Sequence, residues 1–292
     1  MRRFILDTDW WTDCDDAVAL RLLCNAHIAK EVQIAGININ ACMPWSVPSV
    51  DVFTRYSGVE VPLGIDHSAT GFDGTPSYQE NLAKSGKIRR SNDDVPEGID
   101  FYWQLLMQAG EQELEIASIG FTQVLAGVLQ RKGGSELIAG KVKHLWVMGG
   151  KWDEDGGREY NFCKNEQTRA SAALLCDRWP TPITFLGWEV GNSVISGGAL
   201  AEDDLLKQVM IDHGSAQGRS SWDPMLILLA LAGDAEKAGY EVVCGRARVE
   251  AGTGANHFER DKEGRHRYVI KKHPDSWYAS EIDRRLPRLA LP

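Results

Sequence analysis

Five aspartates lie within ten residues near the amino terminus, in the segment Asp7-Thr8-Asp9-Trp10-Trp11-Thr12-Asp13-Cys14-Asp15-Asp16. Asp13 and Asp16 have the spacing of a helix capping box, and acids in a first helical turn complement the helix dipole by about 0.3–1 kcal/mol each. Capping accounts for two of the five. Crowding the others raises their pKa values unless a cation neutralises them, and oxygen ligands favour calcium or magnesium. The segment therefore predicts a metal-binding or catalytic site.

Two further polar groups lie far away in the sequence. Asp223 stands between Trp222 and Pro224 at a predicted loop-to-helix junction, where it has the position of a helix cap. Near the first cluster it would complete an oxygen cage. Glu159 and Asn161 are two residues apart on a segment that we expect to be extended, so their side chains would point the same way and bracket a polyol. Alone, that segment would be an exposed loop.

Strand-like and helix-like patterns alternate along the whole chain. Strands are predicted at residues 4–6, 31–40, 61–65, 114–119, 142–148, 183–187, 240–243 and 268–271, and helices at 17–24, 46–55, 99–109, 122–130, 168–177, 203–213, 222–232 and 277–289. This alternation predicts an α/β fold, with a mostly parallel central sheet and helices on both faces. Residues 1–292 are expected to form a single domain, with a surface excursion at about 66–98. In such folds, ligands bind at the carboxyl ends of the strands, where the acidic segment begins.

Composition excludes several classes of protein. The 32 basic and 41 acidic residues give a net charge of −9, which disfavours nucleic acid as a partner. No apolar run is long enough for a membrane span or a signal peptide, so no membrane association is expected. The six cysteines form no C-x-x-C pair, which argues against a zinc ribbon or a thioredoxin-type site. We expect a soluble, reduced, cytoplasmic protein.

Taken in order, the motifs resemble those of the inosine–uridine-preferring nucleoside hydrolase family. The family signature D-x-D-P-G-x-D-D-A is matched by Asp7-Thr8-Asp9 and Asp15-Asp16-Ala17, with two extra residues between them. The V-x-M-G-G strand end corresponds to Val147-Met148-Gly149-Gly150, E-F-N to Glu159-Tyr160-Asn161, and H-D-P to Trp222-Asp223-Pro224. A weaker turn motif corresponds to Ser118-Ile119-Gly120-Phe121-Thr122-Gln123. The resemblance covers nearly the whole chain and implies the Rossmann-like nucleoside hydrolase fold.

The resemblance also implies an activity: calcium-dependent hydrolysis of the N-glycosidic bond of a ribonucleoside, giving ribose and free base. Asp9 would be the general base on the attacking water. The implied calcium ligands are Asp9, Asp16, Asp223 and a backbone carbonyl near Ile119, and the implied ribose contacts are Asp15, Asn40, Glu159 and Asn161. The two-residue insertion leaves the roles of Asp13, Asp15 and Asp16 open to exchange. A homodimer or homotetramer acting in purine or pyrimidine salvage is the implied setting.

One departure concerns the leaving group, because Trp222 replaces the histidine that precedes the metal-binding aspartate in the family. An indole N–H cannot protonate a leaving base at neutral pH. The excursion would supply another acid, for which the candidates are His67, Asp73 and Tyr78. Alternatively, Trp222 with Trp10, Trp11 or Trp188 would stack on a purine while solvent delivers the proton. Trp188 follows a predicted strand end and would shape the same pocket. A third outcome is a substrate whose leaving group needs no protonation, or no catalysis.

Two competing classes remain at the level of sequence. A haloacid dehalogenase-type phosphatase also begins with a strand and D-x-D, but Trp11 stands where that pattern needs threonine. A riboside-binding protein that kept the metal and ribose contacts while losing efficient catalysis is the stronger alternative. The missing histidine favours this alternative, and the retention of Asp9 argues against it.

Overall fold

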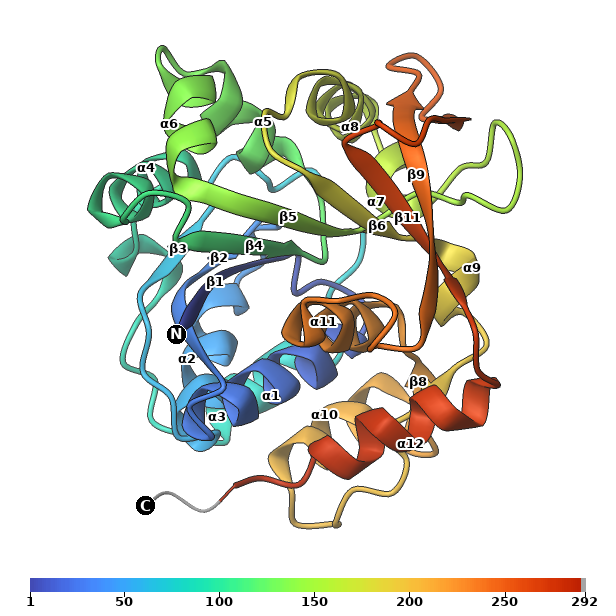
Figure 1. Ribbon diagram of the computed structural model, residues 1–292. Helices are drawn as coiled ribbons and strands as arrows, with labels where there is room; N and C mark the ends of the chain where they lie inside the picture. Colours follow the sequence, from blue (N-terminus) through green and yellow to red (C-terminus); the bar gives the residue numbers. More distant parts are fainter. Residues whose placement is uncertain (290–292) are drawn as a thin grey trace.

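The computed structural model describes residues 1–289 (Figure 1). Within these residues, nine strands form one sheet in the order β10-β9-β11-β6-β5-β4-β1-β2-β3. The strands are β1 (Arg2–Thr8), β2 (Val32–Ile39), β3 (Leu63–Ile65), β4 (Leu114–Ser118), β5 (Val142–Met148), β6 (Ile183–Leu186), β9 (Tyr240–Val249), β10 (Asn256–Arg260) and β11 (His266–Lys271). The run from β11 to β3 is parallel throughout, whereas β9 pairs antiparallel with both β10 and β11. The expected mostly parallel sheet is confirmed.

Helices cover both faces of the sheet (Figure 1). They are α1 (Asp15–Ile28), α2 (Ser46–Tyr56), α3 (Gln79–Lys84), α4 (Gly98–Gln108), α5 (Gln123–Gln130), α6 (Gly134–Lys141), α7 (Tyr160–Cys163), α8 (Glu166–Arg178), α9 (Trp188–Gly191), α10 (Leu205–His213), α11 (Trp222–Ala232) and α12 (Asp275–Arg285). One apolar core contains side chains of α1, α2, α10 and α11, and a second contains side chains of α4, α5 and α8. These two cores lie on opposite faces, which explains why the central strands are apolar on both sides.

Strand β1 illustrates how the sequence places the predicted site. Phe4 and Leu6 belong to the core that contains α1 and α11, and Ile5 belongs to the other core. Because successive side chains of a strand point to opposite faces, this strand is buried on both sides at the centre of the sheet. It ends at Thr8, so the acidic segment emerges at the carboxyl edge of the sheet.

Several elements differ from the sequence expectations. The excursion at 66–98 contains α3 and a 3₁₀ turn at Asn92–Asp94, and the last helix ends at Arg285 rather than at residue 289. Helix α6, helix α9, strand β10 and a ribbon of β7 (Ile195–Ser196) with β8 (Arg219–Ser220) were not expected. These elements are short or polar, and tertiary contacts hold them where local pattern does not. No helix within residues 1–289 has the length and apolar character to cross a bilayer.

Candidate active site

A cavity of about 380 Å³ lies where β1, β4, β5 and β6 end. Its wall consists of Asp9, Trp11, Thr12, Asp13, Asp15, Asp16, Ile119, Met148, Glu159, Tyr160, Asn161, Trp188, Trp222 and Asp223. Every residue in the predicted site except Asn40 belongs to this wall. The volume falls in the range of small-molecule sites, and its walls combine acids with aromatic rings.

Three buried carboxylates meet on one side of the cavity. Each of Asp15, Asp16 and Asp223 offers an oxygen, and these oxygens lie within 4.8 Å of one another. Asp15 and Asp16 stand in the first turn of α1, and Asp223 stands in the first turn of α11. Helices α1 and α11 pack side by side (Figure 1), so their amino termini bring together carboxylates that are distant in sequence. The helix dipoles favour negative charge at this point.

Burial raises the pKa values of Asp9, Asp15, Asp16 and Asp223 well above the usual range of a carboxyl group. Repulsion among these carboxylates raises the values further. Such a group of hard oxygen donors is stabilised in its charged form by a bound divalent cation. The donor set therefore fits a hard metal ion.

Hydrogen bonds from the turn after β1 orient two of these acids. The Thr8 hydroxyl and the Trp10 backbone N–H both donate to Oδ1 of Asp16, and the Trp11 N–H donates to Oδ1 of Asp9 at 3.0 Å. Trp10 and Thr12 have left-handed backbone conformations, with φ of 48° and 46°. The longer turn thus adopts an uncommon backbone path that aims its N–H groups at the carboxylates.

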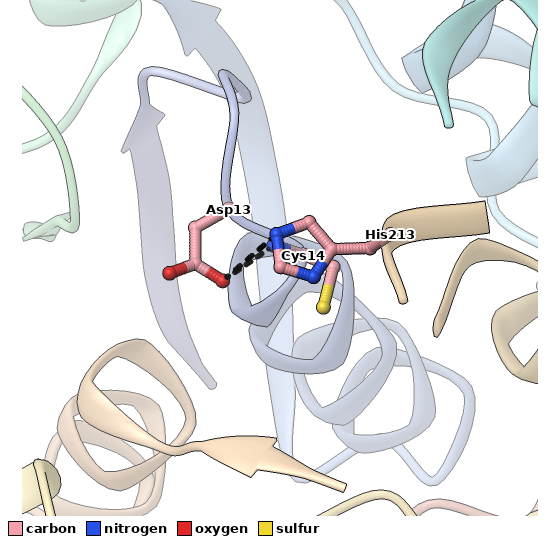
Figure 2. A group of neighbouring side chains, drawn as sticks. All are labelled: Asp13, Cys14 and His213. Carbon is pink, nitrogen blue, oxygen red and sulfur yellow. Dashed lines mark hydrogen bonds and ion pairs between the residues drawn. The ribbon is translucent and has the colours of Figure 1, made fainter. Parts of the chain in front are cut away.

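Asp13 pairs with a basic residue and is not part of the three-carboxylate cluster. Its two carboxylate oxygens accept hydrogen bonds from Nε and Nη2 of Arg219, the shortest at 2.6 Å. Figure 2 shows the carboxylate pointing toward His213, whose Nε2 is 3.8 Å away. Asp13, Cys14 and His213 also offer ligand atoms within 4.8 Å of one another, but the guanidinium already occupies the carboxylate. Of the three interchangeable acids, Asp15 and Asp16 are therefore the two beside Asp223.

Glu159 and Asn161 belong to the same cavity wall. Both Glu159 oxygens accept backbone N–H groups, from Asn161 at 2.7 Å and from Gly150 at 3.1 Å. Burial raises the pKa of Glu159 to about 7. The Asn161 amide donates to the Met148 carbonyl at 3.2 Å. The extended segment expected here is wrong, because Glu159 caps α7 and the helix begins at the next residue.

Aromatic side chains form another part of the wall. The rings of Trp11 and Tyr160 are stacked, with centroids 6.2 Å apart and planes 19° apart. Lys164 Nζ lies 5.1 Å from the centroid of each ring. The indole N–H of Trp222 donates to the Trp188 carbonyl at 2.8 Å. The walls therefore include four aromatic residues together with the carboxylates.

Tyr160, Thr12 and Met148 line the cavity and were not expected as site residues. Their only sequence signal was proximity: Tyr160 lies between Glu159 and Asn161, Met148 ends β5, and Thr12 is in the acidic segment.

Other candidates from the sequence lie outside the cavity wall. Asn40 is fully buried, and its Oδ1 accepts the Phe121 N–H at 3.0 Å. Trp10 is fully buried and donates from its indole to the Ser49 hydroxyl. His67 is hydrogen-bonded to Glu97. Tyr78 packs edge-on against Trp10, and Asp73 is exposed. Within residues 1–289, the excursion thus contributes no titratable side chain to the cavity wall. Its Gly74 carbonyl accepts a hydrogen bond from the Trp11 indole N–H.

Comparison with solved structures gives the fold a precedent. No family model matches the sequence, and neither does any curated protein. An inosine-guanosine nucleoside hydrolase matches with a TM-score of 0.73 and 12% identity, over 99% of this chain and 100% of that one. A purine-preferring ribonucleoside hydrolase from Gardnerella vaginalis matches with a TM-score of 0.74 and 16% identity, over 98% of both chains.

The chain has the nucleoside hydrolase fold. At these identities the match concerns the fold, and it confirms the architecture implied by the motifs. Proteins with other roles share the nucleoside hydrolase fold. The type III effector XopQ, solved with adenosine diphosphate ribose, matches with a TM-score of 0.64 and 14% identity, over 98% of this chain and 90% of that one.

Proposed function

We propose that this protein is a divergent nucleoside hydrolase: a metal-dependent N-ribosyl hydrolase that cleaves a ribonucleoside into ribose and free base. The observation that carries the proposal is a single cavity whose wall combines a cluster of buried carboxylates with aromatic rings. Ribose is a polyol that needs polar partners, and a nucleobase is a flat aromatic ring. The two kinds of wall residue thus match the two halves of a nucleoside.

We assign Ca²⁺ as the metal, held by Asp9, Asp16, Asp223 and the Ile119 carbonyl. Hard carboxylate and carbonyl oxygens are the ligands that calcium prefers, and all four residues line the cavity. The Asp15 carboxylate lies beside those of Asp16 and Asp223. We assign it to a ribose hydroxyl. When bound, the metal supplies positive charge and a template for water and the ribose diol.

Asp9 acts as the general base. A water oxygen attacks C1′ of the ribose, its proton passes to a carboxylate oxygen of Asp9, and the C1′–N bond breaks with its electron pair going to the base. Positive charge develops on the ribosyl ring as the bond lengthens, as in glycoside hydrolysis. Glu159 and Asn161, which hydrogen bonds already hold in place, bind the ribose hydroxyls and stabilise that charge. Asn40 stays a predicted ribose contact, although its side chain is fully buried and lies outside the cavity wall.

The leaving base stacks against Trp222, and Trp188 and Trp11 belong to the same cavity wall. All three indoles line the cavity, whereas none of the acids proposed from the excursion does. An aromatic contact contributes about 0.5–1.5 kcal/mol, and the electron-rich indole face favours the base in its protonated form. Solvent then delivers the proton to the departing base. This arrangement favours purine ribonucleosides, since purines have the larger ring surface.

A second candidate is a riboside-binding protein with weak or no catalysis. The replacement of the family histidine by Trp222 supports it, as does the likeness in fold to an effector solved with adenosine diphosphate ribose. In that case, calorimetry would detect tight binding of a ribonucleoside or of ADP-ribose without product.

A reducing-sugar assay on a panel of ribonucleosides, with calcium and again with a chelator, tests the proposal. We expect ribose release that the chelator abolishes and calcium restores. Absence of ribose release from every nucleoside, with calcium binding demonstrated by calorimetry, would reject the hydrolase and favour the riboside-binding protein.

The setting of the reaction follows from the proposed family. We infer a cytoplasmic homodimer or homotetramer that acts in purine or pyrimidine salvage. The support is the resemblance of the motifs to the family. Multi-angle light scattering of the purified full chain tests the oligomeric state directly.

A further inference from the structure

Arg219 lies beside the cavity on β8, one strand of the ribbon that precedes α11. Its guanidinium forms a fork with the Asp13 carboxylate: Nε to Oδ1 is 2.9 Å, and Nη2 to Oδ2 is 2.6 Å. A bidentate pair of this kind fixes orientation as well as distance. Arg219 therefore ties the turn after β1 to the start of the segment that leads into α11.

The same guanidinium lies over the Trp222 indole, with Cζ 5.4 Å from the ring centroid. The edge of that indole is held by its N–H bond to the Trp188 carbonyl. Behind it, Gly191 of α9 approaches so closely that a Cβ there would lie 2.5 Å from the Trp222 Cα. Trp222 is thus restrained at its edge, at its backbone and at its ring, and Arg219 supplies the ring contact.

We propose that Arg219 is a positioning residue, which couples the Asp13 turn to Trp222 and holds the indole where it receives the leaving base. This inference rests on the proposed hydrolase function. One guanidinium joins the two departures from the family motif, the inserted turn and the tryptophan in place of histidine. Asp13 and Trp222 both line the cavity, whereas Arg219 acts through them.

The coupling depends on guanidinium geometry more than on charge. Asp13 already neutralises the positive charge of Arg219, so its net field at the leaving base is small. A planar guanidinium can form a two-pronged pair and lie over an aromatic ring at once, and an ammonium group cannot. Lysine should therefore fail to replace Arg219.

The first test compares two leaving groups in Arg219→Gln and Arg219→Lys. Inosine needs help for its base to depart, whereas p-nitrophenyl riboside releases a stable anion. We expect kcat for inosine to fall about tenfold in both variants, the loss of about one stacking contact. Turnover of p-nitrophenyl riboside should stay within about twofold. Equal losses on both substrates, or full rescue by lysine, would overturn the proposal.

Arg246→Gln is the matched control. Arg246 is an exposed arginine, and its Nη2 lies 3.4 Å from Oδ1 of Asp177. Loss of an exposed pair of this kind costs little, so this variant should retain both activities. A double-mutant cycle with Trp222→Ala adds a second criterion. Arg219→Gln should cost little on inosine once Trp222 is gone, and additive losses would contradict the coupling.

A readout independent of turnover keeps the inference separate from the proposed activity. The full chain labelled with 5-fluorotryptophan gives a Trp222 resonance in ¹⁹F NMR, assigned by its loss in Trp222→Phe. We expect this resonance to shift or broaden in Arg219→Gln and to stay unchanged in Arg246→Gln. An unchanged resonance in Arg219→Gln would overturn the positioning role. If the wild-type protein hydrolyses neither riboside, the proposed function fails and the NMR result still decides the positioning role.

Discussion

The backbone N–H of Asp223 donates a hydrogen bond of 3.1 Å to Oδ2 of Asp15, across a sequence separation of 208 residues. The bond joins the first turns of α11 and α1, so two helix amino termini converge on one acidic group. The positive ends of both dipoles and a shared N–H partly offset the repulsion between the carboxylates. This junction is the structural reason that the acids can stay buried together.

Calcium should stabilise the folded protein through this junction. A cation that binds only the folded state adds about 2.7 kcal/mol at a concentration 100-fold above its Kd. We therefore expect the melting temperature to rise with calcium and to fall with chelator. Asp223→Asn removes a ligand and should lose most of this response. Asp51→Asn is the control, because Asp51 is a buried carboxylate paired with Arg55 and Arg90, and it should respond to calcium as the wild type does.

Glu159 should make the metal-free protein less stable as pH rises. Its pKa of about 7 in the folded state exceeds the ordinary value of 4.5, so the folded state binds the proton more tightly. Stability from this group is complete below pH 4.5 and is lost as pH rises to about 7, at up to about 1.4 kcal/mol per pH unit. Urea unfolding in chelator of wild type and Glu159→Gln isolates the effect. A difference between the two that does not change with pH would contradict the raised pKa.

Asp9→Asn should abolish most activity without unfolding the protein. Asparagine keeps the shape and the oxygen that accepts the Trp11 N–H, but it cannot take a proton from water. Loss of a general base typically costs about 10²–10⁴ in rate. Steady-state kinetics on the best nucleoside of the panel measures kcat. Retention of more than half of the wild-type kcat would assign the base to another residue.

Trp222→Ala should weaken purine turnover more than pyrimidine turnover, because the larger base loses more stacking surface. Removal of one aromatic contact predicts a loss of about 3- to 10-fold in kcat/KM for inosine. Parallel kinetics on inosine and uridine measure the ratio. If both substrates are turned over as in the wild type, stacking against Trp222 plays no part in leaving-group departure.

The ion pair between Arg21 and Asp204, which lies outside the cavity wall, should be a major contributor to stability. Arg21 is fully buried, and its guanidinium makes two bonds of 2.9 and 3.0 Å to the carboxylate. Arg21→Ala leaves Asp204 without its partner, and breaking a buried pair costs about 3–5 kcal/mol. Arg131 and Asp100 form an exposed pair, so Arg131→Ala should cost less than about 1 kcal/mol. Chemical denaturation compares the two variants.

Much of the fold was predictable because its signals are local. The apolar pattern of β1 and the Trp222-Asp223-Pro224 signal near the start of α11 act within a few residues. The capping details were wrong: Cys14 is the N-cap of α1 and makes no side-chain cap hydrogen bond, and Ser221 rather than Asp223 is the N-cap of α11. Helix α9 and the β7–β8 ribbon were not predicted because each is too short to show a period of its own. Helix α6 is as long as α5, but its two glycines and few apolar residues give no helical pattern. The antiparallel β10 escaped for another reason: its residues are polar, and pairing with β9 determines its conformation.

The sequence predicted most of the residues that line the cavity, but not the side chains with which they pair. Order and spacing of the motifs were enough to single out Asp9, Asp16, Asp223, Glu159 and Asn161. Local pattern could not say that Asp13 pairs with Arg219, since their approach depends on how the β7–β8 ribbon packs beside α1. Nor could it separate Trp10, which turns into the core, from its neighbour Trp11, which faces the cavity.

The sequence by itself thus determined which acids are present and where the strands end. It also determined that the ends of parallel strands meet at one edge of the sheet. Tertiary packing alone decided which carboxylates lie together, which one pairs with a guanidinium, and which indoles line the cavity. The physical reason is the sequence distance over which each kind of interaction acts. Propensity and capping act over a few residues, whereas contacts across some two hundred residues exist only once two distant helix termini have packed against each other.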